Sequence, residues 1–180
     1  LFLCGSTGES PSLPVDERMA VSEAYIEACA GRVPVVVHVG HNSLADARAL
    51  AVHAQKAGAD AIAIVPPSYF SIGSIEGLVD CIRDIADAAP DMPLYYYHIP
   101  RLTGVGLRMV DLLERADAVL PSFAGLKFSS FELDDLLCCI RHGGGRYNVL
   151  FGSDEMLLAG LSMGAAGAVE SIFTVLALHH

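Results

Sequence analysis

LPSFAGLKFSS, residues 120–130, is the stretch that decides how this 180-residue sequence folds. Nearly every position is apolar or small, which predicts a buried strand over 122–128. No other charged residue lies between Asp117 and Glu132, so Lys127 places a single ammonium group at the end of that strand. Burial of such a group favours the neutral amine, which is the form that attacks a carbonyl carbon. The alternative is a lysine with a buried stem and a solvated head, and Lys127 taken alone favours that alternative.

Predicted strands and helices alternate along the whole chain. Further strands are predicted at 1–4, 33–40, 61–67, 92–100, 147–152 and 165–169. Helical periodicity lies between them at 16–30, 44–58, 74–89, 107–115, 132–142 and 154–163, and Asp16 and Ser74 are the expected N-terminal residues of two helices. The strands are apolar throughout and recur roughly every 25 to 30 residues, which is typical of a parallel sheet covered by helices.

This alternation predicts an α/β fold of the (β/α)8 TIM-barrel type. A doubly wound sheet also fits, but no GxGxxG motif follows the first strand, and polar residues follow the ends of several different strands. A closed barrel has eight strands in about 250 residues, whereas this sequence predicts seven. We therefore expect residues 1–180 to form one partial barrel domain, a fragment or truncated form that lacks the first strand and the C-terminal helices.

Composition excludes several classes of function. The net charge of −10 and the pI of about 4.9 argue against a nucleic-acid partner or an anionic membrane surface. No apolar run reaches the roughly 20 residues of a membrane span, and the N-terminus lacks the features of a signal peptide. The five cysteines show neither metal nor disulfide spacing, which predicts reduced thiols in the cytoplasm. Because His38, His41 and His98 also lack ligand spacing, no metal is expected.

The polar residues of interest follow the predicted strands. In a parallel barrel the strand ends meet at one rim, so Lys127 would lie beside Tyr97 of the preceding strand. An imine on the lysine would act as an electron sink, and a neighbouring phenol would move the proton that carbon–carbon bond cleavage requires. The turn GSTGE at 5–9 offers hydroxyl and backbone N–H groups to a carboxylate. These residue types together describe a site for a 2-oxo acid.

Three motifs carry a resemblance to a known family. They are GSTGE at 5–9, YHIP at 97–100 with Thr103-Gly104 behind it, and GLK at 125–127. In this order and spacing they resemble the pyruvate-dependent class I aldolases of the N-acetylneuraminate lyase and dihydrodipicolinate synthase superfamily. The resemblance covers about residues 1–169 and leaves a divergent tail over 170–180. The segments YYYHIP, LKFSS and FGSDE resemble the N-acetylneuraminate lyase branch most.

The resemblance implies an aldehyde-lyase that cleaves N-acetylneuraminate, a sialic acid, to pyruvate and N-acetylmannosamine, without a metal or an organic cofactor. Lys127 would form the Schiff base, Tyr97 would be the general acid/base, and Thr7 would belong to the proton relay. Ser6 and Thr7 would bind the substrate carboxylate. The residues implied to contact the sugar are Ser129, Gly152, Asp154, Glu155 and Ser171. The resemblance further implies a homotetramer that acts in sialic acid catabolism.

Several residues keep other interpretations open. Dihydrodipicolinate synthases carry an arginine at the position of Leu102, so that activity is disfavoured, whereas 2-keto-3-deoxy sugar acid and 4-hydroxy-2-oxoglutarate aldolases remain possible. Many relatives have a tyrosine pair where this chain has Tyr69-Phe70, so one hydroxyl of the expected relay is absent. Glu170 replaces a glycine and would repel an anionic substrate. The rival interpretation is a truncated, non-catalytic chain that associates with full-length subunits. The acidic pair 154–155 has an equally simple alternative, charge in the first turn of a helix.

Overall fold

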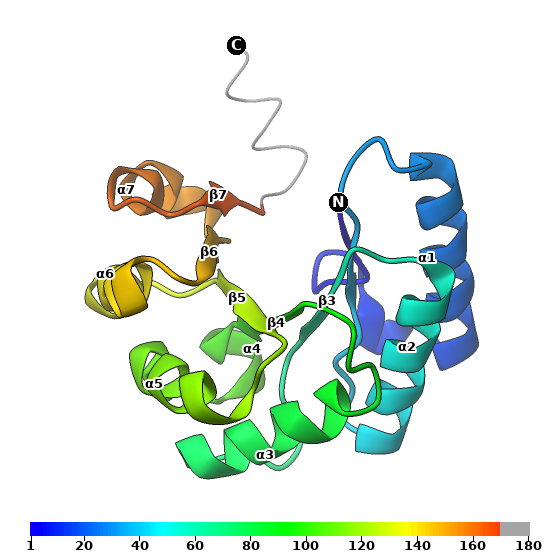
Figure 1. Cartoon of the computed structure of the whole chain (residues 1–180), viewed down its shortest axis with the longest axis horizontal. Helices are drawn as coiled ribbons and strands as arrows, with labels where there is room; N and C mark the ends of the chain where they lie inside the picture. The colour runs from blue at the N-terminus through cyan, green and yellow to red at the C-terminus, as the bar shows by residue number, and fades with distance from the viewer. Residues whose placement is uncertain (170–180) are drawn as a thin grey trace.

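The computed structural model describes residues 1–169, which form one curved sheet of seven parallel strands. The strands are β1 (Phe2–Leu3), β2 (Val36–His38), β3 (Ala61–Ile64), β4 (Leu94–His98), β5 (Phe123–Phe128), β6 (Asn148–Phe151) and β7 (Gly167–Ala168). Each strand pairs with the next one in the sequence, and the helices lie on the outer side of the curve (Figure 1). The described residues thus form a partial TIM barrel with one strand fewer than the eight of a closed barrel, as the sequence predicts.

Helices connect successive strands at nearly all the predicted positions. They are α1 (Val15–Cys29), α2 (Leu44–Ala57), α3 (Ile75–Ala86), α4 (Pro100–Thr103), α5 (Met109–Val119), α6 (Leu133–Arg141) and α7 (Leu157–Ser162). Short 3-10 turns occur at η1 (Ser10–Ser12), η2 (His142–Gly144) and η3 (Asp154–Met156).

Three helix starts show where sequence reasoning succeeded and failed. Ser74 begins α3 as predicted, and its hydroxyl accepts the N–H of Gly77 at 3.2 Å. The prediction that Asp16 precedes the first helix was wrong, because Pro14 occupies that position and Asp16 lies in the first turn. Pro100 was predicted to end a strand but instead begins the short helix α4, since its fixed φ and missing N–H suit a first helical position.

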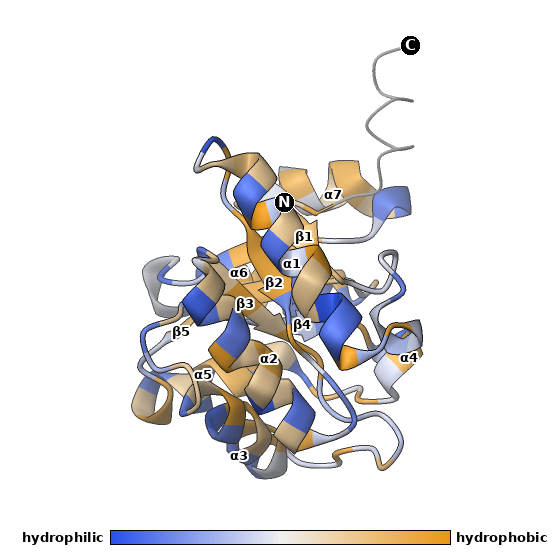
Figure 2. Cartoon of the chain, turned by 90° about the vertical axis from the view of Figure 1, so that its right-hand side faces the viewer, coloured by the Kyte–Doolittle hydropathy of each residue, from blue (hydrophilic) through white to orange (hydrophobic). Residues whose placement is uncertain are grey.

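The hydrophobic core lies between the sheet and its helices. Hydrophilic residues mark the outward sides of α1, α2 and α3, while the strands behind them are mostly hydrophobic (Figure 2). The core includes the fully buried strand residues Ile62, Ile64, Tyr96, Phe128 and Phe151 and the helix residues Leu78, Ile82, Leu112 and Leu136. Strands this thoroughly buried explain the absence of alternation in the sequence.

The contact between β5 and β6 requires a glycine at position 125. A Cβ atom on Gly125 would clash with the carbonyl oxygen of Asn148 on β6. Without a side chain there, β5 keeps a register that pairs Lys127 with Tyr97 on one side and with Leu150 on the other. This glycine therefore helps to place the lysine next to the tyrosine.

A buried carboxylate joins α6 to the start of α5. Asp135, which is 4% exposed, accepts the N–H groups of Met109 at 2.7 Å and Val110 at 3.2 Å. The guanidinium of Arg108 lies 3.7 Å from the same carboxylate. Because the first N–H groups of a helix have no partner within the helix, Asp135 satisfies donors that would otherwise be buried without one.

We expect Asp135→Ala to lower the free energy of unfolding by about 2 kcal/mol, because the two N–H groups lose a charged acceptor. Urea denaturation would measure the loss. Asp134→Ala, at the exposed neighbouring position, is the matched control and should change stability by less than about 0.5 kcal/mol. Equal losses in the two variants would show that Asp135 does not act through α5.

Candidate active site

The paired strands β4 and β5 bring Tyr97 and Lys127 together inside the curve of the sheet. Tyr97 is 4% exposed and Lys127 is 6% exposed. The Nζ atom of Lys127 lies 3.6 Å from the centroid of the Tyr97 ring and 5.1 Å from that of Phe2 on β1. Aromatic faces attract an ammonium group, so two rings support the lysine in its buried position.

Two further predicted residues lie directly against the lysine. Its Nζ atom donates a hydrogen bond of 3.4 Å to the hydroxyl of Ser129. Gly152 follows β6, and a Cβ atom there would lie 3.3 Å from both Cε and Nζ of Lys127 and would clash with the Ser129 hydroxyl. The missing side chain at Gly152 therefore leaves space beside the amine.

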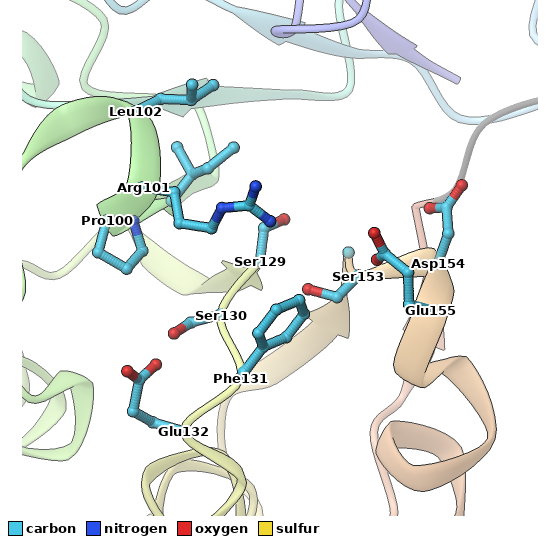
Figure 3. A pocket seen from close by; sticks show the side chains of 12 residues that line it. Pro100, Arg101, Leu102, Ser129, Ser130, Phe131, Glu132, Ser153, Asp154 and Glu155 are labelled. Carbon is cyan, nitrogen blue, oxygen red and sulfur yellow. The ribbon is translucent and has the colours of Figure 1, made fainter.

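A cavity of about 680 Å³ opens next to this cluster (Figure 3). Its lining comes from three segments, Ile99–Leu102 after β4, Ser129–Glu132 after β5 and Gly152–Glu155 after β6. Asp154 and Glu155 project from the segment after β6, and Arg101 projects from α4 across the cavity. The volume suits a sugar-sized ligand, and the carboxylates are good acceptors for hydroxyl groups.

The remaining predicted residues are placed differently. Ser6 and Thr7 lie in the turn after β1, where the carbonyl of Ser6 accepts the N–H of Glu9 at 3.0 Å. Ser6 is half-buried and Thr7 is exposed, and neither lines the cavity. Ser171 lies outside the described residues. The structure thus brings together Lys127, Tyr97, Ser129 and Gly152 and sets Asp154 and Glu155 in the adjoining cavity.

Sequence reasoning missed Phe2 and gave His38 no role in the site. The ring centroids of Phe2 and His38 lie 5.6 Å and 6.0 Å from that of Tyr97. Strand alternation contains the signal that places these two residues on one face of the sheet. Phe2 pairs with Val36, and His38 lies two residues beyond Val36 on the same face of its strand.

Burial controls the protonation of two histidines in this region. Burial, followed by the charge of Arg18 and more weakly that of Lys127, lowers the pKa of His38 to about 3. Burial lowers the pKa of His98, which follows Tyr97, to about 4. Both imidazoles are therefore neutral near pH 7 and add no positive charge around Lys127.

Residues 1–169 contain neither a candidate metal-binding cluster nor a candidate membrane-spanning helix. No group of three or more histidine, cysteine or acidic side chains in this range could hold a metal ion. Within the same residues, no helix is both long and apolar enough to cross a membrane.

The profile of the Dihydrodipicolinate synthetase family matches residues 1–179. The chain belongs to the dihydrodipicolinate synthetase family. Among curated members, N-acetylneuraminate lyase A of Xenopus laevis is 43% identical over 177 residues, which are 98% of this chain and 58% of that protein. The Homo sapiens N-acetylneuraminate lyase is 41% identical over 178 residues, which are 98% of this chain and 56% of that protein.

Solved structures of family members have the same fold. The Proteus mirabilis N-acetylneuraminate lyase superposes with a TM-score of 0.92 at 35% identity, over 96% of this chain and 58% of that chain. Dihydrodipicolinate synthase from Aquifex aeolicus superposes with a TM-score of 0.88 at 29% identity, over 98% of this chain and 59% of that chain. The chain thus spans a little over half the length of the relatives that it matches.

We expect Gly152→Ala to slow the reaction of Lys127 with a small aldehyde and borohydride by at least about tenfold, because the new methyl group occupies the space beside the amine. Mass spectrometry of the peptide that contains Lys127 would measure the labelling rate. Gly106→Ala is the control, since a Cβ atom there meets nothing within 4 Å. Unchanged labelling in Gly152→Ala would show that the amine is approached from another side.

Protonation of His98 should make the fold less stable in acid. The unfolded chain takes up a proton near the ordinary pKa of 6.5, whereas the folded chain resists it down to about 4. Stability should therefore fall as the pH drops through this window, by roughly 1.4 kcal/mol per pH unit for this one group. Urea denaturation of wild type and His98→Phe between pH 6.5 and 4 would measure it. The variant should have the flatter profile, and parallel profiles would contradict the assignment.

Proposed function

We propose that this protein is a Schiff-base aldolase that cleaves N-acetylneuraminate to pyruvate and N-acetylmannosamine. The observation that carries the proposal is a buried lysine amine that lies 3.6 Å from the centre of a tyrosine ring and against Ser129 and Gly152, two residues that line a sugar-sized cavity. Relatives that share about 40% of the residues are N-acetylneuraminate lyases, which supports the choice of substrate.

In the proposed reaction the neutral amine of Lys127 attacks the C2 ketone of the open-chain substrate and gives a carbinolamine. The phenol of Tyr97 donates its proton to the departing hydroxyl, which leaves as water and forms the iminium. The phenolate then accepts the proton of the C4 hydroxyl while the C3–C4 bond breaks. The electrons of that bond move into the iminium, which becomes an enamine, and the aldehyde product is released.

The second half of the reaction returns the site to its starting state. The Tyr97 phenol protonates C3 of the enamine, which restores the iminium of pyruvate. Water attacks this iminium and passes a proton to the phenolate, and collapse of the carbinolamine releases pyruvate and the free lysine. We assign Ser6 and Thr7 to the substrate carboxylate, with Thr7 also in the proton relay. Ser129, whose hydroxyl is 3.4 Å from the lysine nitrogen, would orient the amine.

The cavity would hold the polyhydroxylated part of the substrate. Asp154 and Glu155 lie on its wall and offer carboxylate oxygens to the sugar hydroxyls. Gly152 leaves room for the reacting carbons beside Lys127. Ser171 is assigned to the same sugar by the family resemblance.

A second candidate is another pyruvate-dependent aldolase. Arg101 also lines the cavity, and no ion pair within residues 1–169 involves its guanidinium. A cation there would suit a substrate with a second carboxylate, which favours the 4-hydroxy-2-oxoglutarate type over the 2-keto-3-deoxy sugar acid type. A non-catalytic chain that associates with full-length subunits is the remaining alternative.

We further propose a cytoplasmic homo-oligomer, a tetramer as in the family, that acts in sialic acid catabolism. All five cysteines are free thiols, which suits a reducing compartment. Tyr69 and Phe70 are 81% and 82% exposed and pack edge to face with ring centroids 4.9 Å apart. An exposed aromatic pair of this kind supports a contact with another subunit.

Reductive trapping tests the proposal. We expect pyruvate with borohydride to label Lys127 and to leave Lys56 unlabelled. Lys56 is the only other lysine of the sequence and lies exposed on α2, outside the candidate site, so it is the internal control. Lys127→Arg should abolish labelling, and Tyr97→Phe should lower kcat for N-acetylneuraminate by about 100-fold or more. Pyruvate release from N-acetylneuraminate and from 4-hydroxy-2-oxoglutarate, compared side by side, separates the two activities. A folded protein that is not labelled at Lys127 would contradict both proposed aldolase activities.

A further inference from the structure

Three aromatic side chains from three different strands contact one another beneath the Lys127 amine. The rings of Phe2 and Tyr97 are 5.6 Å apart and nearly perpendicular, at 77°. The rings of His38 and Tyr97 are 6.0 Å apart at 88°, and those of Phe2 and His38 are 6.2 Å apart at 33°. Two nearly perpendicular neighbours leave the Tyr97 ring little freedom to turn.

His38 is the most firmly held member of this group. Its Nδ1 atom lies 3.4 Å from the hydroxyl of Ser10, which is itself 2% exposed. The buried guanidinium of Arg18 donates to the backbone carbonyls of His38 at 2.7 Å and of Gly40 at 3.1 Å. The imidazole is thus held through its ring by η1 and through its backbone by α1.

The orientation of Tyr97 matters because the lysine nitrogen lies over the face of its ring, 3.6 Å from the centroid. A rotation of the ring would move the phenol oxygen relative to the amine and to any carbon attached to it. We propose that His38 is a positioning residue, which holds the plane of the Tyr97 ring against the Lys127 amine during the lyase reaction. This inference rests on the proposed function and adds a residue to which that function assigns no role.

His38 acts by shape and not by charge. The titratable or charged groups that face it are Arg18 from α1, Tyr97 from β4 and Lys127 from β5, while Cys4 after β1 contributes a hydrogen bond from its backbone. Its pKa of about 3 keeps the ring uncharged throughout the usual assay range. A ring of similar size without nitrogen atoms should therefore replace it with little loss and without changing the pH profile of kcat.

The experiment compares four single variants of the purified protein and the double variant Ser10→Ala/His38→Phe. His38→Leu removes the ring, His38→Phe keeps a ring, and Ser10→Ala removes the hydroxyl beside Nδ1. His98→Leu is the matched control, because His98 is equally buried at 3% exposure but its ring packs on Phe128, 5.0 Å away, on the other face of β4. The readouts are kcat and KM for N-acetylneuraminate, pyruvate trapping at Lys127 and the thermal midpoint.

We expect His38→Leu to lower kcat about 10- to 100-fold with KM changed less than about threefold. His38→Phe should restore kcat to within about threefold of wild type with an unchanged pH profile. Ser10→Ala should lower kcat in the wild-type background but not in the His38→Phe background. The phenyl ring at position 38 has no nitrogen atom for the Ser10 hydroxyl to bond, so loss of that hydroxyl then has no effect on the ring. His98→Leu should lower the thermal midpoint as much as His38→Leu while keeping kcat.

Two results would overturn the inference while leaving the proposed function intact. In the first, the wild-type protein traps pyruvate and cleaves N-acetylneuraminate, and kcat of His38→Leu stays within about twofold of the wild-type value. The other is an equal loss of kcat in His38→Leu and His98→Leu. Should His38→Leu fail to fold, the Ser10→Ala effect in the two backgrounds decides, and equal effects overturn the inference. A wild type that neither traps pyruvate nor cleaves the substrate contradicts the proposed function and, with it, the role of His38.

Discussion

The structure depends on keeping a lysine amine inside a parallel sheet. Moving an ammonium group from water into such an interior is unfavourable, so its surroundings must compensate. The faces of Tyr97 and Phe2 and the hydroxyl of Ser129 provide part of this compensation. The neutral His38 ring, which packs on Tyr97, avoids adding charge of the same sign. The interactions that hold the amine therefore also keep it beside the Tyr97 ring, 3.6 Å from its centroid.

Two regions of different polarity meet at this lysine. Its inner side is aromatic and closely packed, whereas the adjoining cavity combines apolar side chains with hydroxyl and carboxylate groups and one guanidinium. Such a division suits a substrate with one reacting carbonyl end and one hydroxylated end. The glycines at 125 and 152 are needed on the two sides of this boundary, one for the approach of β6 and one for access to the amine.

The sequence predicted the order of the elements well because strand and helix periods are local properties. All seven strands lie within the predicted stretches. Pairing of Lys127 with Tyr97 followed from parallel topology, since neighbouring strands end at one rim. Strand alternation gives the face on which Phe2 and His38 lie but not their contact with Tyr97, because β4 is not adjacent to either of their strands in the sheet. The start of the first helix was misjudged because a short carboxylate such as Asp16 suits both the position before a helix and its first turn.

The sheet order also keeps paired strands close together in the sequence. Because the strands follow one another in the sheet as they do in the sequence, each new strand pairs with one completed only a few tens of residues earlier, as in the pairs Phe2 with Val36 and Gly125 with Asn148. Loop closure at each step is therefore of similar and modest entropic cost. Pairing in this order also requires no segment to be threaded past a strand that is already in place.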